Sequence, residues 1–474
     1  MASERAIGKS NITNGENDGC EDLPLFVSYQ EVQDYELSPA GSARLLRGGL
    51  EKIMTYLADN DPERLSLQER QELQDRQVSA VVEYAYGNSP AMRKKMDRAG
   101  ITPSEVRCVK DIEKIPVTKK DDLIRLQQED PPFGGLLAGP LEDVTEIFVS
   151  PGPIYDPFSE EVYTKTERVL YAMGFRKGDL VLNTFSYHLV PAGLYLHLAL
   201  RNMGVKVVPS GVGNTELQLQ VIRELQVTGF VGTPSFLMTL IKRAESLGYD
   251  FRKDFHLKTA YLASEMLPTN MRDSFENDYR IHTSQAYAFA EMGITAYECG
   301  EKSGMHMVED FLIEITDPAT GKQVGSGEIG EVVVTSFEKT RPLLRLGTGD
   351  LSVYTDAPCA CGRTSPRLLR IVGRVGEAIK VRGMFVHPKE LGQSLSKFPY
   401  VSVYQAVVNR SGHRDEVTLK IELENENIDK EKLSKEILQC VSADCRVKFD
   451  RVECLGKGVL PEDCKAIVDK RTWS

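Results

Sequence analysis

The sequence lacks any apolar run of about 18 residues, the length that marks a transmembrane helix. Its first two dozen residues are polar and have no apolar core of the kind found in secretory signals. We therefore expect residues 1–24 to form a disordered tail and the protein to be cytoplasmic. The 9 cysteines agree with this location, because thiols in a chain without a secretory signal are typical of a reducing compartment.

The sequence also has no excess of basic charge, since 58 Lys and Arg residues stand against 69 Asp and Glu residues. Nucleic acids and anionic membranes repel an acidic surface of this kind, so we expect neither as a partner. A small-molecule ligand is compatible with this charge, because a local basic pocket can exist on an acidic protein. With 474 residues, of which 41% are hydrophobic, the chain is expected to fold into two or more domains.

The first part of the chain is predicted to begin with a helical stretch and to continue with alternating strands and helices. Residues 25–130 are predicted to be largely helical, with a capping box at Ser66 and Glu69. Farther on, short aliphatic runs alternate with helical segments, which predicts right-handed βαβ units and a parallel sheet. The predicted strands are 180–182, 205–208, 230–232 and 259–263. Three helices are predicted between them: the first spans 193–203, the second begins with a Thr215–Gln218 capping box, and the third is capped by Ser235. The second helix is expected to bury the face formed by Leu217, Val221 and Leu225.

The rest of the chain has mixed patterns. Residues 311–316 and 328–335 are predicted strands joined by a turn rich in Gly, Pro and Asp, so they form an antiparallel hairpin. A smaller α+β unit follows, which suggests a large domain over 25–373 and a small mobile domain over 374–474. Its predicted helices are 388–396 and 429–441, and its predicted strands are 401–409, 416–422 and 447–454.

Several segments form an ordered series of motifs: Ile115–Gly135 (IPVTKKDDLIRLQQEDPPFGG), Val207–Thr215 (VVPSGVGNT), Tyr287–Glu291 (YAFAE), Thr348–Asp350 (TGD) and Ile371–Pro388 (IVGRVGEAIKVRGMFVHP). In this order they resemble the phenylacetate–CoA ligase family of the adenylate-forming (acyl-CoA synthetase) superfamily. The resemblance implies an α/β fold, with a large N-terminal adenylate-forming domain of mixed and parallel sheets and a small C-terminal α+β domain. It also implies an ATP-dependent acid–CoA ligase and a homodimer.

The implied reaction has two steps. An aryl or arylacetic acid reacts with ATP to give an acyl-adenylate and pyrophosphate, and the thiol of CoA then displaces AMP. Negative charge must be stabilised in both steps. The site therefore needs hydrogen-bond donors to the phosphates, a carboxylate for Mg²⁺, a residue that binds the ribose and a lysine. The implied cofactors and substrates are ATP/AMP, Mg²⁺, CoA and a small carboxylic acid.

The resemblance assigns roles to individual residues. Glu291 corresponds to the metal-associated catalytic Glu, and Mg²⁺ prefers oxygen ligands of this kind. Asp350 corresponds to the ribose-binding Asp, since an ionised carboxylate can accept two hydroxyl hydrogen bonds. Lys465 resembles the catalytic Lys that reaches the carboxylate and the α-phosphate, although a surface lysine is an equally simple interpretation. The other residues predicted to bind the nucleotide are Ser264, Glu265, Tyr287 and Arg374. For Arg374, the alternative is a surface arginine in the linker between the two domains.

Tyr187 and His188 follow a predicted strand, in a loop where the family places aromatic residues near the acyl pocket. The resemblance therefore assigns them to the carboxylic acid. Core packing is the alternative for both, and His188 could also be an ordinary loop histidine.

Cysteine and histidine residues cluster in two loops. Cys299 and His306 lie seven positions apart in the first, and Cys359 and Cys361 form a CxC in the second. This set predicts a tetrahedral Cys3His zinc site with a structural role. A zinc ion would join the loop after the Glu291 motif to the loop after Asp350. The alternative is two unrelated loops with free thiols.

The chain departs from the family in its phosphate loop. The family has a Ser-Ser-Gly-Thr-Thr-Gly-Lys-Pro type segment, whereas residues 150–157 read SPGPIYDP. Pro151 and Pro153 have no N–H to donate to a phosphate. Asp156 places an anion where the family has a lysine, so it is expected to repel a triphosphate. The candidates that could compensate for the lost lysine are Lys119, Lys120 and Lys165.

A second departure is at the predicted hinge, where Gly376 replaces the usual acidic or lysine pivot. These departures leave two functions open. The first is an acid–CoA ligase with an atypical phosphate loop. The second is a protein of the same fold that no longer uses ATP and instead binds a nucleotide or CoA or transfers acyl groups. Retention of Glu291, Asp350 and Arg374 favours the ligase.

Overall fold

The structure is a computed structural model. It describes residues 62–150, 152–375, 379–382, 384–386, 388–412, 414–424, 429–445, 447–461 and 464–471. These residues all belong to one compact unit that spans Met54–Ser474. The predicted tail 1–24 and the predicted pivot Gly376 lie outside the described residues. Among the described residues, no helix combines the length and the apolar character needed to cross a membrane.

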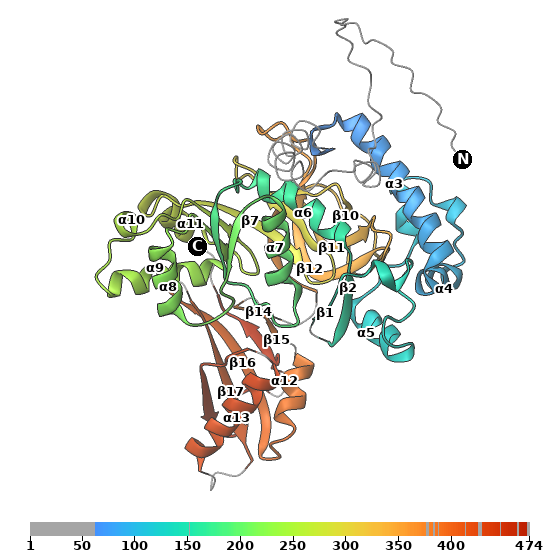
Figure 1. Cartoon of the computed structure of the whole chain (residues 1–474). Helices are drawn as coiled ribbons and strands as arrows, with labels where there is room; N and C mark the ends of the chain where they lie inside the picture. Colours follow the sequence, from blue (N-terminus) through green and yellow to red (C-terminus); the bar gives the residue numbers. More distant parts are fainter. Residues whose placement is uncertain are drawn as a thin grey trace, which may run out of the picture. The chain divides into compact units, whose positions relative to one another are not determined.

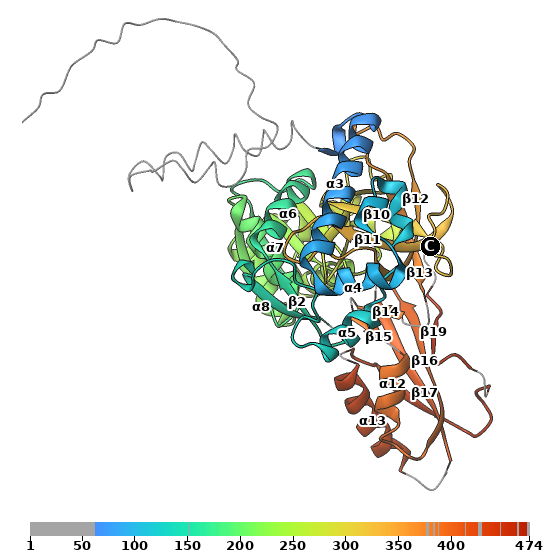
Figure 2. The same ribbon diagram turned by 90° about the vertical axis from the view of Figure 1, so that its right-hand side faces the viewer.

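The described N-terminal part is helical, as predicted (Figures 1 and 2). The predicted capping box is confirmed, because the Ser66 side chain accepts from Glu69 N while the Glu69 carboxylate accepts from Ser66 N. The main helices are α3 (Leu67–Asn88), α4 (Pro90–Ala99) and α5 (Lys120–Glu129).

A sheet of 11 strands forms the centre of the fold, in the order β10-β11-β12-β13-β9-β8-β7-β6-β5-β3-β4. The neighbours among β4, β3, β5, β6 and β7 pair in parallel, which confirms the predicted βαβ units. This half consists of β3 (Leu180–Asn183), β4 (Lys206–Pro209), β5 (Gly229–Gly232), β6 (Thr259–Leu262) and β7 (His282–Phe289), with the helices α7 (Pro191–Asn202), α8 (Thr215–Glu224), α9 (Pro234–Ser246), α10 (Phe251–Asp254) and α11 (Thr269–Asp273).

The other half of the sheet is antiparallel. The predicted hairpin is confirmed as the pair β10–β11. The halves meet where β7 pairs with β8, and within the antiparallel half β9 pairs with β13 through His306 with Arg367 and Met305 with Leu368. The strands of this half are β8 (Gly293–Glu298), β9 (Met305–Met307), β10 (Phe311–Thr316), β11 (Ile329–Ser336), β12 (Leu346–Thr355) and β13 (Arg367–Arg374).

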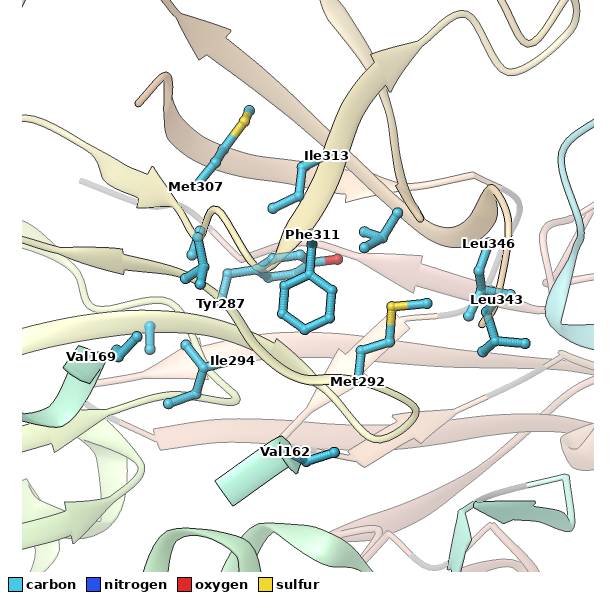
Figure 3. Packing of buried hydrophobic residues seen from close by; sticks show 14 of the residues in the cluster. Val162, Val169, Tyr287, Met292, Ile294, Met307, Phe311, Ile313, Leu343 and Leu346 are labelled. Atoms are coloured by element: carbon cyan, nitrogen blue, oxygen red, sulfur yellow. The ribbon is translucent and has the colours of Figure 1, made fainter. Parts of the chain in front are cut away.

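Apolar side chains from distant segments form the core beneath this half, as Figure 3 shows. Val162 and Val169 of helix α6 (Glu160–Ala172) lie in the same buried cluster as Ile294 and Phe311. A short antiparallel hairpin of β1 (Glu146–Ser150) and β2 (Ile154–Phe158) precedes α6.

The C-terminal residues form an α+β arrangement with its own buried cluster, coloured orange to red in Figure 1. Its four-stranded sheet has the order β18-β17-β16-β19, and β14 and β15 form a separate pair. The predicted strand 447–454 is shorter, since β18 begins only at Arg451. The elements are β14 (Ile379–Val381), β15 (Met384–Val386), α12 (Pro388–Leu395), β16 (Val401–Ser411), β17 (Arg414–Leu423), α13 (Lys430–Asp444), β18 (Arg451–Leu455) and β19 (Ile467–Asp469).

The predicted buried face of α8 is wrong. Leu217 and Leu225 are 51% and 52% exposed, and the buried stripe is the neighbouring one, made of Gln218, Leu219 and Ile222. The predicted cap of α8 at Thr215 is also wrong. The side chain of Asn214, whose backbone is left-handed, accepts a hydrogen bond from Leu217 N and caps the helix. This turn sets the direction in which α8 leaves β4. The spacing of apolar residues alone does not reveal that direction. Likewise the cap of α9 is Thr233, not Ser235.

Candidate active site

A cavity of about 1470 Å³ lies at the carboxyl ends of the parallel strands. It is lined by residues that directly follow these strands, including Thr184 after β3, Thr233 after β5 and Ser264 after β6. Ligands of open α/β sheets bind at this edge, because strand ends and loops converge there. Residues of β12 and the end of β13 form another part of the wall.

Asp350 and Arg374 lie on this wall as register partners on adjacent strands. Arg374 Nε is 3.0 Å from Asp350 Oδ1, and Arg374 Nη2 donates to the Thr348 carbonyl at 2.8 Å. The Tyr287 hydroxyl donates to the other carboxylate oxygen at 2.8 Å. The Tyr287 ring itself is buried in the apolar core (Figure 3), so it orients Asp350 from behind. Burial raises the pKa of Tyr287 well above its usual value, which keeps the hydroxyl a donor.

Glu331 of β11 is a cavity residue that the sequence analysis missed. Its Oε1 accepts from Gly349 N at 3.0 Å, and a Cβ at Gly347 would lie 2.6 Å from the same oxygen. Burial raises the pKa of Glu331, and the hydrogen bond from Gly349 N and the Lys119 ammonium oppose this effect. The sequence signal that could have revealed Glu331 is an acidic residue within a largely apolar strand, since β11 reads IGEVVVTS. The absence of a side chain at Gly347 is therefore required by this carboxylate.

Ser264 and Glu265 line the cavity directly after β6. Ser264 has a left-handed backbone (φ 69°), which is unusual for a residue with a side chain. Glu265 Oε2 accepts from Ser235 N at 3.3 Å, and burial raises the pKa of this carboxyl group. These two residues, which are predicted to bind the nucleotide, thus lie on the same wall of the cavity.

Glu291 is fully enclosed and forms an ion pair with Lys120, whose Nζ lies 2.7 Å from its Oε1. Burial alone would raise the pKa of Glu291, but the ammonium of Lys120 outweighs this effect and lowers it. A second buried pair lies beside the first: Arg341 Nη1 is 2.7 Å from Asp156 Oδ1, and Arg341 Nη2 donates to the Glu291 carbonyl. The four side chains carry no net formal charge.

This arrangement corrects the expectation that Asp156 repels a triphosphate. Asp156 is fully buried in β2, and its charge is matched by Arg341, so it does not present a free anion to the cavity. The sequence could not reveal this, because Arg341 is far from Asp156 along the chain.

We predict that Asp156→Asn destabilises the protein by about 3 kcal/mol, because it leaves the Arg341 guanidinium buried beside a neutral group. Thermal unfolding of the purified variant measures this as a lower Tm. As a control, Asp122→Asn removes an exposed ion pair with Arg125 and should shift Tm far less. Equal Tm values for Asp156→Asn and the unmodified protein would show that the buried pair has no structural role.

Three other predicted residues lie elsewhere in the described part of the chain. The Tyr187 hydroxyl contacts His197 Nδ1 at 3.2 Å, and His188 is exposed. Their neighbours Phe185 and Ser186 line the cavity instead. Lys465 is exposed, and its carbonyl accepts from the Gln405 side chain. Of the three lysines considered for the phosphates, Lys119 and Lys120 line the cavity, whereas Lys165 borders a separate small cavity beside α6.

Cys299, His306, Cys359 and Cys361 converge as predicted, with their ligand atoms within 4.8 Å of one another. Cys299 Sγ and Cys359 Sγ are 3.8 Å apart, and Cys361 Sγ is 3.3 Å from His306 Nε2. Tetrahedral zinc with Zn–S bonds near 2.3 Å requires separations of about this size. His306 Nδ1 faces the carbonyl and hydroxyl of Ser365, which leaves Nε2 for a metal, and burial lowers the pKa of His306 to about 4. The donor set therefore fits zinc.

Comparisons with known proteins agree with this geometry. Residues 162–340 match the family model of AMP-binding enzymes, and residues 383–471 match that of the AMP-binding enzyme C-terminal domain. The chain is 33% identical to the phenylacetate–coenzyme A ligase of Thermus thermophilus, covering 77% of this chain and 85% of the relative. It is also 33% identical to the Escherichia coli phenylacetate–coenzyme A ligase, over 78% of this chain and 86% of the relative.

Among solved structures, 2-hydroxyisobutyryl-CoA ligase in complex with its acyl-AMP and CoA has a TM-score of 0.80 and 25% sequence identity, covering 86% of this chain and 91% of that one. The chain belongs to the AMP-binding enzymes, in the family of the phenylacetate–CoA ligases. Its class is that of the AMP-forming acid–CoA ligases. The family, fold class and enzyme class predicted from the sequence are confirmed.

Proposed function

We propose that the protein activates an aryl or arylacetic acid with ATP and transfers the acyl group to CoA. In the first step a carboxylate oxygen attacks the α-phosphorus of ATP and pyrophosphate leaves. In the second the CoA sulfur attacks the acyl carbonyl, and AMP leaves. The observation that carries this proposal is the pair of Asp350 and Arg374 on the cavity wall, braced by Tyr287. The relatives that share this fold are named for phenylacetate and 2-hydroxyisobutyrate, and the cavity here is lined by Phe185, Tyr195 and Tyr261.

The proposed roles follow from the positions of the side chains. Asp350 accepts the ribose hydroxyls, and Arg374 holds that carboxylate and contacts the ribose or a phosphate. Ser264 and Glu265 receive the adenine beside the end of β6. Lys465 is assigned to the acid and the α-phosphate during adenylation, by resemblance.

Magnesium is expected to enter with the phosphates of ATP, which supply most of its ligands. Glu291 offers oxygen donors of the right kind, and it is already balanced by Lys120. A cation at Glu291 therefore requires Lys120 to move. When bound, magnesium would neutralise the charge on the phosphates.

We also propose that the cluster of three cysteines and His306 binds a structural zinc ion. It would hold together the loops that precede β9 and β13. A cytoplasmic location and a homodimer remain predictions that rest on the sequence and on the family resemblance.

The proposal predicts pyrophosphate release that depends on the acid. The purified full-length protein is incubated with ATP, Mg²⁺ and a panel of benzoic and arylacetic acids, and pyrophosphate is measured. Adding CoA should convert the acyl-adenylate to a thioester with stoichiometric AMP. If no acid of this panel gives pyrophosphate while other carboxylic acids do, the substrate class is wrong. If none of either kind does, the ligase function is wrong.

A further inference from the structure

The loop between β1 and β2 offers no positive charge to a phosphate. Ser150 and Gly152 line the cavity there, followed by Ile154, and Asp156 of β2 is buried against Arg341. An enzyme that handles a triphosphate needs a cation near this loop, because charge develops on the departing phosphates. That cation must come from another element.

Helix α5 packs directly on this loop. A Cβ at Gly152 would lie 3.0 Å from Ile124 Cδ1, so the loop and the helix are in contact. The Gln127 side chain donates to the Tyr155 carbonyl and accepts from Tyr155 N, both at 2.8 Å. These contacts fix the orientation of α5 relative to the hairpin.

Lys120 lies on the same face of α5 as these contact residues. Positions four and seven residues apart share one face of a helix, which places Lys120, Ile124 and Gln127 in a row. Lys119 precedes the helix and is exposed. The Lys120 side chain is 30% exposed, lines the cavity and is held by the enclosed carboxylate of Glu291.

We propose that Lys120 contacts the phosphate chain of ATP and supplies the charge that the β1–β2 loop lacks. This inference rests on the proposed function. Glu291 holds the ammonium at the cavity wall in the absence of nucleotide, and Lys120 turns to the phosphates when ATP binds. Lys120 is thus a catalytic residue supplied by α5 in place of a loop lysine.

Nucleotide binding without any carboxylic acid tests this proposal, because no turnover occurs. Calorimetry on the full-length protein compares the affinities for ATP and AMP, with and without Mg²⁺. In Lys120→Met the Kd for ATP should rise about 10- to 100-fold, the value of a charge-assisted contact. The Kd for AMP should stay nearly constant, which also shows that the variant is folded. Lys120→Arg should retain most of the ATP affinity.

Lys119→Met is the matched control, since it removes a neighbouring cavity lysine without touching Glu291. Its effect on ATP should be much smaller than that of Lys120→Met. An equal effect of the two variants, or an equal loss of ATP and AMP affinity in Lys120→Met, would overturn the proposal.

The outcomes separate this inference from the proposed function. If the unmodified protein releases no pyrophosphate with any acid, but Lys120→Met still loses ATP affinity selectively, the function is wrong and the phosphate contact stands. If pyrophosphate is released normally and Lys120→Met binds ATP like the unmodified protein, the contact is wrong and the function stands.

Discussion

Replacing Asp350 with asparagine is expected to raise the Kd for both ATP and AMP by about 100-fold or more. The carboxylate is positioned to accept two ribose hydroxyls, and each hydrogen bond to a charged group contributes about 1.5–3 kcal/mol. The amide is neutral and has only one acceptor oxygen. It would also weaken the contacts with Arg374 and Tyr287, which now orient both carboxylate oxygens. Equilibrium binding and the KM for ATP in the pyrophosphate assay measure the loss.

The equal effect on ATP and AMP distinguishes Asp350 from Lys120, whose replacement should weaken only ATP. Asp310→Asn serves as the control, since Asp310 is also paired with an arginine, Arg168, and does not appear among the described residues that line the cavity. It should leave both nucleotide affinities nearly unchanged. Nucleotide affinities in Asp350→Asn within about threefold of the unmodified protein would contradict the proposed ribose site.

Removing zinc is expected to lower the Tm by at least about 5 °C, because a structural ion contributes its binding energy directly to folding. Cys359→Ser should have the same effect and should abolish the metal content. The reason lies in the sheet, where the short pairing of β9 with β13 joins strands β7 to β9 to strands β10 to β13. Metal analysis should find one zinc ion per chain in protein purified without chelator.

Cys108→Ser is the control, since this half-buried free cysteine lies outside the cluster. It should retain the zinc ion and nearly the full Tm. Protein that contains no zinc, or a Tm that does not change on chelation, would contradict the proposed metal site.

The fold could be predicted in large part, because βαβ alternation and family motifs are local in the sequence. The strands 180–182, 230–232 and 259–263 correspond closely to β3, β5 and β6. The face of α8 could not be predicted, since a left-handed cap at Asn214 decides which stripe meets the core.

The candidate site, like the fold, could be predicted from the sequence only in part. The position of Asp350 on the cavity wall followed from a motif, and the cysteine cluster followed from residue type and spacing. The neutralisation of Asp156 by Arg341 depends on a contact between distant segments, which no local pattern contains. Glu331 was missed for a similar reason, because its role appears only when β11 lies beside β12.

The short pairing of β9 with β13 has a consequence for the order of folding. Strands β10 to β13 follow one another along the chain and pair with their neighbours, so this half has contacts of low sequence separation. The parallel half needs crossovers through helices, and such long-range pairing forms more slowly. Cys299, after β8, and Cys359, before β13, are 60 residues apart and reach the cluster from opposite sides of this pairing. Capture of the ion is therefore expected only after β8 with β9 and β10 to β12 have each formed, so that chelators added during refolding should trap a species with a formed β10–β11 hairpin and with β9 and β13 unpaired.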